Sequence, residues 1–210
     1  MSYHRLDPKR TAVLFFDMLN AYYRGADEAT QRRMEPVVAN CVRIMDAARA
    51  TGIPIFYARA DHRPDLADSV TLISDTDHSL QPWPDPAHPR RFTPAATAGS
   101  WKGEVIDEIR PQPGDYVITK HRWSAFYQTH LELSLRTRGI DTIVLAGGST
   151  DVGIVSTAYS ARDRDFNLVI VRDACTANQQ DNQEQLMDRI FPRMARIRTT
   201  DQVIEMMQGK

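Results

Sequence analysis

Two charged side chains and one glycine-rich turn are the residues of this sequence best suited to carry out a reaction. Asp17 ends an apolar run, Lys120 ends a second run far along the chain, and the turn 147–150 (Gly-Gly-Ser-Thr) follows a third. If these runs are parallel strands of one sheet, their carboxyl ends share an edge and the three features meet in one pocket. A carboxyl beside an ammonium can hold or move a proton, whereas the alternative is a structural ion pair at the sheet edge.

The protonation state of Asp17 depends on two opposed effects. Lys120 lowers the pKa of Asp17 if both groups remain charged, and burial raises it. The stronger effect decides whether Asp17 works as a base or as an acid. Backbone N–H groups of the turn at 147–150 would lie at a helix N-terminus, a setting suited to a developing oxyanion. Ser149 and Thr150 can instead act simply as helix caps.

These groups require a sheet that brings distant residues to one edge, and the sequence predicts such a sheet. Short apolar runs typical of buried strands occupy residues 11–17, 53–58, 115–119, 142–146 and 167–171. Helical patterns separate or follow them, from Asp27 to Thr51-Gly52 and at 102–110, 127–138, 152–163 and 184–190. The alternation predicts an α/β fold with a central, mostly parallel sheet, right-handed crossovers and helices on both faces.

Residues 61–100 interrupt this alternation. They show little periodicity and contain three histidines and a run of prolines: Pro64, Pro82, Pro84, Pro86, Pro89 and Pro94. A segment of this length without regular elements is uncommon unless it serves a function. It either covers the ligand pocket or reaches a partner subunit, or it is a solvated surface excursion. The chain is otherwise expected to form a single domain over residues 1–210, with this long loop inserted.

Composition excludes some classes of partner. The 26 Lys and Arg residues balance 27 Asp and Glu, a formal charge of -1, which gives no long-range field for nucleic acid or an anionic membrane. A small neutral or mildly charged ligand fits better. No stretch approaches the roughly 18 apolar residues of a membrane span, and the N-terminus lacks a signal-peptide core, so we expect a cytoplasmic protein. Cys41 and Cys175 lie in apolar contexts typical of buried, reduced thiols.

Three motifs, each at the end of a predicted strand, resemble the isochorismatase-like hydrolase superfamily, which contains cysteine amidohydrolases and isochorismatases. They are DMLNAY at 17–22, KHRWSAF at 120–126 and GGSTDVG at 147–153, followed by STA at 156–158 and by Asp173-Ala174. The resemblance covers most of the chain, apart from residues 61–100 and the last helix. It implies a three-layer α/β/α sandwich in which Asp17 and Lys120 match the aspartate and the lysine of the family site.

The third position of that family site falls on Gly153. In the amidohydrolase branch this residue is a cysteine whose thiolate attacks the substrate carbonyl, and glycine closes that covalent route. The isochorismatases are similar to this chain because they also carry glycine there, and they protonate a vinyl ether so that water adds to the resulting cation. Such chemistry suits Asp17 as a general acid. The resemblance further implies a cis peptide bond at Ser149 and a homodimer or homotetramer.

Motif position also nominates residues that would bind the substrate: Tyr22, Trp101, Trp123, Phe126, Gly148 and Ser149 around the pocket, and Arg122 as an anchor for a carboxylate. Core packing is the alternative for Phe126, and simple surface exposure is the alternative for Arg122. No metal or cofactor is predicted, because Asp61-His62 lacks the Asp-x-His spacing of metal-binding relatives. His78 and His88 lie far off in the inserted loop.

The sequence therefore predicts a hydrolase that acts on a small molecule through Asp17, with direct attack by water on a vinyl ether or a C–N bond. Two alternatives stay open. One is a non-catalytic protein that binds a small ligand after losing its nucleophile. The other is a Cys-to-Gly variant of a cysteine amidohydrolase, in which Gly153 replaces a natural cysteine.

Overall fold

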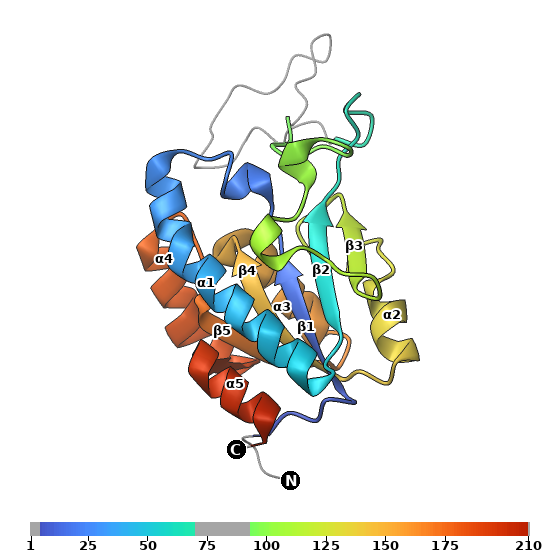
Figure 1. Cartoon of the computed structure of the whole chain (residues 1–210), viewed down its shortest axis with the longest axis vertical. Helices are drawn as coiled ribbons and strands as arrows, with labels where there is room; N and C mark the ends of the chain where they lie inside the picture. Colours follow the sequence, from blue (N-terminus) through green and yellow to red (C-terminus); the bar gives the residue numbers. More distant parts are fainter. Residues whose placement is uncertain (1–4, 70–92, 210) are drawn as a thin grey trace.

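The computed structural model describes residues 5–69 and 93–209, which form a parallel six-stranded sheet. Its strands are β1 (Thr11–Phe16), β2 (Ile55–Ala60), β3 (Tyr116–Lys120), β4 (Thr142–Gly148), β5 (Asn167–Thr176) and β6 (Arg196–Arg198). In the sheet they lie in the order β3-β2-β1-β4-β5-β6, so the chain moves outward in one direction from β1 and then in the other (Figure 1). Sheets of this kind bind ligands beyond the carboxyl ends of the strands where the order reverses, here between β1 and β4.

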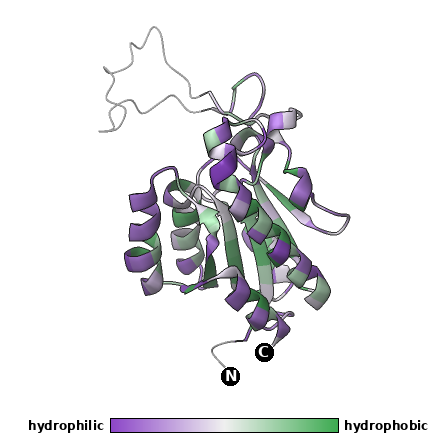
Figure 2. Ribbon diagram, turned by 60° about the vertical axis from the view of Figure 1, so that its left-hand side comes forward, coloured by the Kyte–Doolittle hydropathy of each residue, from purple (hydrophilic) through white to green (hydrophobic). Residues whose placement is uncertain are grey.

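Helices cover both faces of the sheet, which confirms the three-layer α/β/α sandwich (Figure 1). One face carries α1 (Glu28–Thr51) and α5 (Thr200–Gln208), and the other carries α2 (Leu131–Thr137), α3 (Val155–Arg162) and the turns after α4 (Gln180–Gln185). Figure 2 shows hydrophobic strands in the centre and hydrophilic outer faces on the helices. Because both faces of β1 are covered, all six of its residues are buried.

Neighbouring side chains of β1 belong to different cores. Phe15 packs in the cluster that includes α1 and α5, whereas Phe16 packs in the cluster that includes α2 and α3. This is the period of two expected for a strand covered on both sides. Phe16 thereby faces the helix that follows β4, and the residue after it, Asp17, leaves the sheet at the carboxyl edge.

The predicted helix at 102–110 is wrong. The structure has two single turns there, Trp101–Gly103 and Asp107–Ile109, joined by extended chain. The N–H of Asn20 donates to the carbonyl of Glu104, and the N–H of Ile106 donates to the carbonyl of Met18, both at 3.0 Å. Because these backbone groups bond to the segment after β1, they are not available for helical hydrogen bonds.

Other elements differ from the prediction mainly at their ends. β5 continues to Thr176, five residues beyond the predicted end at 171, α2 begins at Leu131, and α4 begins at Gln180 and continues as the π-helical turn Leu186–Ile190. Neither β6 nor the bounds of α5 were predicted from the sequence. The signal for α5 was available, because Thr199 forms a capping box with a glutamine three residues later.

The two cysteines, Cys41 and Cys175, are free and buried, as predicted. Of the inserted loop, the described parts 61–69 and 93–100 consist of turns and a single bridge between His62 and Thr97. His78 and His88 lie outside the described residues. Within the part of the chain that the structure describes, no helix is both long and apolar enough to cross a membrane.

Candidate active site

Asp17 and Lys120 meet at the carboxyl edge of the sheet, as the sequence predicts. The Nζ of Lys120 donates to Oδ2 of Asp17 at 2.7 Å, and the backbone N–H of Ala60 donates to Oδ1 at 2.9 Å. Only 6% of the Lys120 side chain and 12% of the Asp17 side chain are exposed. In the strand between them, β2, the carbonyl of Ala58 accepts the N–H of Asp17, and Ala60 pairs with Lys120 in register.

Burial is the dominant influence on the pKa of Asp17. It raises this pKa above the ordinary value of 3.8, although the Lys120 ammonium, the Ala60 N–H and His62 all act in the opposite direction. The backbone at Asp17 has a φ of 48°, an uncommon left-handed conformation that turns the chain sharply out of β1. The site thus holds a carboxyl that keeps its proton to higher pH than an exposed aspartate.

Gly153 lies against the ring of Phe16, in the π-helical turn Thr150–Ile154 that leads into α3. A Cβ built on Gly153 would lie 2.5 Å from Cζ of Phe16 and closer still to Cε1. The Phe16 ring is itself buried, with 1% of the residue exposed, and the Lys120 ammonium lies 4.4 Å from the ring centroid. A single aromatic ring therefore contacts both Gly153 and Lys120, and it fills the space of a side chain at 153.

The turn after β4 completes this edge. The Gly148–Ser149 peptide bond is cis, as the resemblance implied. Gly147 has a φ of 118°, and a Cβ there would overlap the backbone of Phe16, so only glycine fits this close approach of β4 to β1. The carbonyl of Ser149 accepts the N–H of Gly153 at 3.0 Å, while its hydroxyl donates to the carboxylate of Asp151.

The predicted aromatic residues have different environments. Tyr22 is 38% exposed, and burial of the rest of the residue together with the charge of Asp17 raises its pKa to about 12, so its hydroxyl stays protonated at neutral pH. Phe126 is buried in the core that includes α3, which is the packing alternative for this residue. Trp101 and Trp123 are 54% and 70% exposed.

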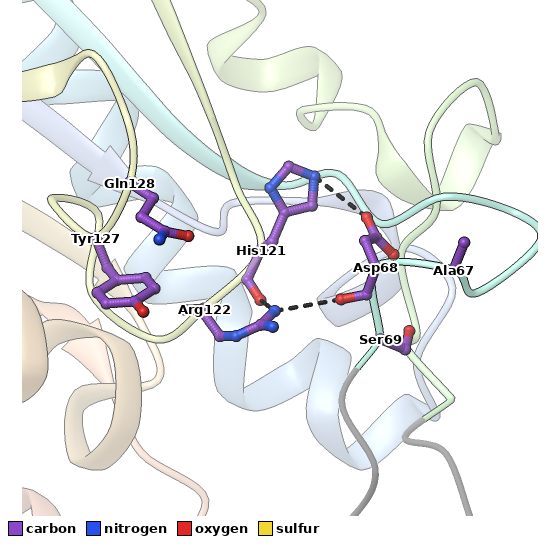
Figure 3. Close-up of a pocket in the computed structure, with 7 residues that line it drawn as sticks. All are labelled: Ala67, Asp68, Ser69, His121, Arg122, Tyr127 and Gln128. Atoms are coloured by element: carbon purple, nitrogen blue, oxygen red, sulfur yellow. Dashed lines mark hydrogen bonds and ion pairs between the residues drawn. The ribbon is translucent and has the colours of Figure 1, made fainter.

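A pocket of about 370 Å³ opens beside the end of β3 (Figure 3). Its lining consists of Ala67, Asp68, Ser69, His121, Arg122, Tyr127 and Gln128. The Nη1 of Arg122 donates to the carbonyl oxygens of His121 (2.6 Å) and Asp68 (3.3 Å), and Nε2 of His121 lies 3.3 Å from Oδ2 of Asp68. The predicted anchor Arg122 therefore lines a pocket whose His121 directly follows Lys120 in the chain.

His62 lies beside this pocket and contacts two of the residues that line it. Its ring lies edge-to-face against His121, 5.7 Å between centroids, and its Nδ1 is 3.6 Å from Oδ1 of Asp68. Burial lowers the pKa of His62, and Asp68 opposes that shift. The charge of His62 makes only the smallest of the contributions that lower the pKa of Asp17.

Several of these residues escaped the sequence analysis. Phe16 looks like one more apolar residue of a buried strand, and Asp68 and Gln128 lie on irregular segments whose placement depends on the fold. At His62 the sequence pattern suggests at most a metal ligand and gives no sign of its place beside His121. Within residues 5–69 and 93–209, no group of three or more His, Cys, Asp and Glu side chains is arranged to hold a metal ion.

Comparison with known proteins gives consistent matches along the chain. Residues 11–202 match the Isochorismatase domain. The uncharacterized isochorismatase family protein YecD of Escherichia coli O157:H7 is 33% identical over 199 residues, 95% of this chain and 97% of YecD. The ureidoacrylate amidohydrolase RutB of Methylobacterium radiotolerans is 31% identical over 175 residues, 80% of this chain and 68% of RutB.

A solved structure extends the likeness to three dimensions. The crystal structure of N-carbamoylsarcosine amidase from Thermoplasma acidophilum aligns with a TM-score of 0.70 and 29% identity. The alignment covers 91% of this chain and 97% of the amidase. The order and packing of the elements are therefore shared across nearly the whole of both chains.

Proposed function

This chain belongs to the isochorismatase family, and from that premise we propose that it hydrolyses a small molecule by acid–base catalysis at Asp17. Water adds directly to the substrate, and no bond forms to the protein. The observation that carries the proposal is the buried carboxyl of Asp17, whose pKa is raised although Lys120 lies 2.7 Å away. Gly153, which packs against the Phe16 ring, has room for no side chain that could attack the substrate.

The acid route begins with protonated Asp17. Its proton passes to the terminal carbon of an enol ether, which leaves a cation on the carbon that carries the ether oxygen. Water adds to that cation and returns a proton to the Asp17 carboxylate, and the hemiketal then breaks into an alcohol and a carbonyl product. Lys120 stabilises the carboxylate that forms when the proton leaves, so burial does not trap the proton on Asp17.

Hydrolysis of a C–N bond is the second candidate, because two of the similar proteins are an amidohydrolase and an amidase. In this route ionised Asp17 takes a proton from the attacking water. The rate then rises with pH through the pKa of Asp17, whereas in the acid route it falls through the same pKa. The raised pKa of Asp17 supports the acid route, since it enlarges the protonated fraction near neutral pH.

We place the rest of the substrate in the pocket beside β3. The planar guanidinium of Arg122 suits a carboxylate, because its remaining donors can form a bidentate contact while Nη1 bonds to two backbone carbonyls. The neutral hydroxyl of Tyr22 supplies a hydrogen-bond donor close to Asp17. A small anionic substrate would then extend from the Asp17 carboxyl toward Arg122.

Turnover of enol ethers, amides and ureides tests this proposal. With a substrate found in that panel, Asp17→Asn should lower kcat by roughly 10²–10⁴-fold, the usual contribution of a general acid or base. Asp107→Asn, at an exposed position, is the matched control for Asp17→Asn and should leave kcat unchanged.

Two results would reject it in different ways. If Asp17→Asn keeps kcat within a few-fold of the unsubstituted protein, Asp17 is not the acid or base. If an acyl adduct on the chain appears by mass spectrometry during turnover, the reaction is covalent. Tight binding of a small ligand without turnover of any class in the panel favours the non-catalytic alternative. A homodimer or homotetramer, also proposed from the resemblance, is checked by light scattering of the purified protein.

A further inference from the structure

We propose that Phe16 is the third member of this site. Its ring excludes any side chain at position 153 and also serves as a second counter-group for the Lys120 ammonium. Phe16 is a positioning residue, because it acts on the reaction through Lys120 and Asp17. Its role in catalysis rests on the proposed function, whereas its packing against Gly153 is independent of any activity.

The steric part follows from the position of the ring. A Cβ on Gly153 would overlap Cε1 and lie 2.5 Å from Cζ and 2.9 Å from Cδ1 of Phe16. Non-bonded carbon atoms prefer separations of about 3.5–4.0 Å, so the ring or the helix must move to admit even a methyl group. The strand cannot shift easily, because Gly147 of β4 packs directly against the backbone of Phe16. An aromatic ring at 16 and a side chain at 153 therefore exclude each other.

The electrostatic part follows from the two neighbours of the Lys120 ammonium. It lies 2.7 Å from the Asp17 carboxylate and 4.4 Å from the centroid of the Phe16 ring. When Asp17 is protonated, Lys120 loses its anionic partner, and with 6% of its side chain exposed it gains little from water. The negative face of the ring remains, since aromatic rings attract cations at this distance. Phe16 thus remains a partner of the Lys120 ammonium while Asp17 is protonated, the state from which acid catalysis starts.

Gly153 leaves this position without a nucleophile, and Phe16 keeps it so, because the ring occupies the space that a side chain at 153 would need. Restoring a thiol by Gly153→Cys would push the new side chain into the Phe16 ring. The single substitution is therefore expected to damage packing rather than to create a cysteine hydrolase, and a thiol at 153 requires a smaller residue at 16.

Melting temperatures of a double-mutant cycle test the packing. Gly153→Ala should lower the melting temperature by roughly 2–12 °C, the range for overpacking a core in a chain of this size. Phe16→Leu should recover much of that loss in the double variant. Phe15→Leu is the matched control, because Phe15 is the neighbouring residue of β1, equally buried but in the opposite core, and its effect should add to that of Gly153→Ala.

Additive effects of Phe16→Leu and Gly153→Ala, or an unchanged melting temperature in Gly153→Ala, would overturn the packing claim. If Gly153→Ala does not fold, the double variant with Phe16→Leu decides. A folded double variant supports the claim, and an unfolded one rejects it. None of these measurements depends on a substrate, so they remain decisive even if Asp17→Asn proves fully active and the proposed function fails.

A second double-mutant cycle tests the positioning role in an Asp17→Asn background, where Lys120 has no carboxylate beside it. Phe16→Leu should lower the melting temperature by roughly 1–8 °C more with Lys120 present than with Lys120→Met, the range expected from one cation–π contact in a chain of this size. Phe15→Leu should lower it equally in both. Equal losses for Phe16→Leu with and without Lys120 would refute the role, because a purely structural defect does not depend on the charge at position 120.

Discussion

Replacing Lys120 with methionine removes the ammonium beside Asp17 but keeps an apolar side chain of similar length. In the unsubstituted protein the ammonium lies 2.7 Å from the carboxylate and opposes the effect of burial on the pKa of Asp17. An opposite charge this close lowers the pKa of a carboxyl by about 1–3 units, so its removal should raise the pKa of Asp17 by about that amount. The variant should therefore lose stability in a way that depends on pH.

The sign follows from proton linkage. The unfolded chain releases the Asp17 proton near pH 3.8, while the folded chain retains it to a higher pH. Between these two values the folded state holds one more proton, and the free energy of unfolding falls as pH rises. Lys120→Met extends that interval upward by about 1–3 units, at about 1.4 kcal/mol per unit. The two proteins should be similar near pH 4 and differ by about 1.4–4 kcal/mol above the folded pKa of the variant.

Calorimetry across this pH range checks the prediction. The difference in melting temperature should grow from near zero at about pH 4 to roughly 3–16 °C at about pH 8. Lys102→Met, at an exposed lysine, should show no such trend. The double variant Asp17→Asn with Lys120→Met should lose the pH dependence, since it has no carboxyl to titrate there. A Lys120→Met deficit that is equal at both pH values would refute the reasoning.

Three further predictions concern other parts of the chain. Cys41 and Cys175 should resist a thiol reagent in the folded protein and react after unfolding, because burial raises both pKa values, that of Cys175 to about 12; fast labelling of the folded protein would contradict this. Gly147→Ala should destabilise the protein far more than Gly139→Ala. Gly139 has a φ of 70° but open space around it, so its substitution should cost about 1–2 kcal/mol. Equal losses in urea unfolding would contradict the close approach of β4. Thr199→Ala should cost about 1 kcal/mol through loss of the cap of α5, and an unchanged urea midpoint would show that the cap contributes nothing.

The sequence predicted five of the strands because their burial on both faces leaves continuous apolar runs. It also placed Asp17 and Lys120 at the ends of two such runs, and parallel strands bring such ends to one edge. The same reasoning failed at 102–110, where a pattern compatible with a helix forms two single turns. The deciding contacts are hydrogen bonds to Met18 and Asn20, some 85 residues earlier in the chain, which no local pattern reports.

Residue types and order along the chain thus determined the layers, the carboxylate and ammonium at one rim, and the absence of a thiol at 153. The tertiary structure alone decided the balance of charges and volumes there. The pKa of Asp17 depends on how much water the packed elements exclude, and the room at Gly153 depends on where β1 directs the Phe16 ring. Both are properties of distances between residues far apart in sequence, and such distances exist only after the chain has folded.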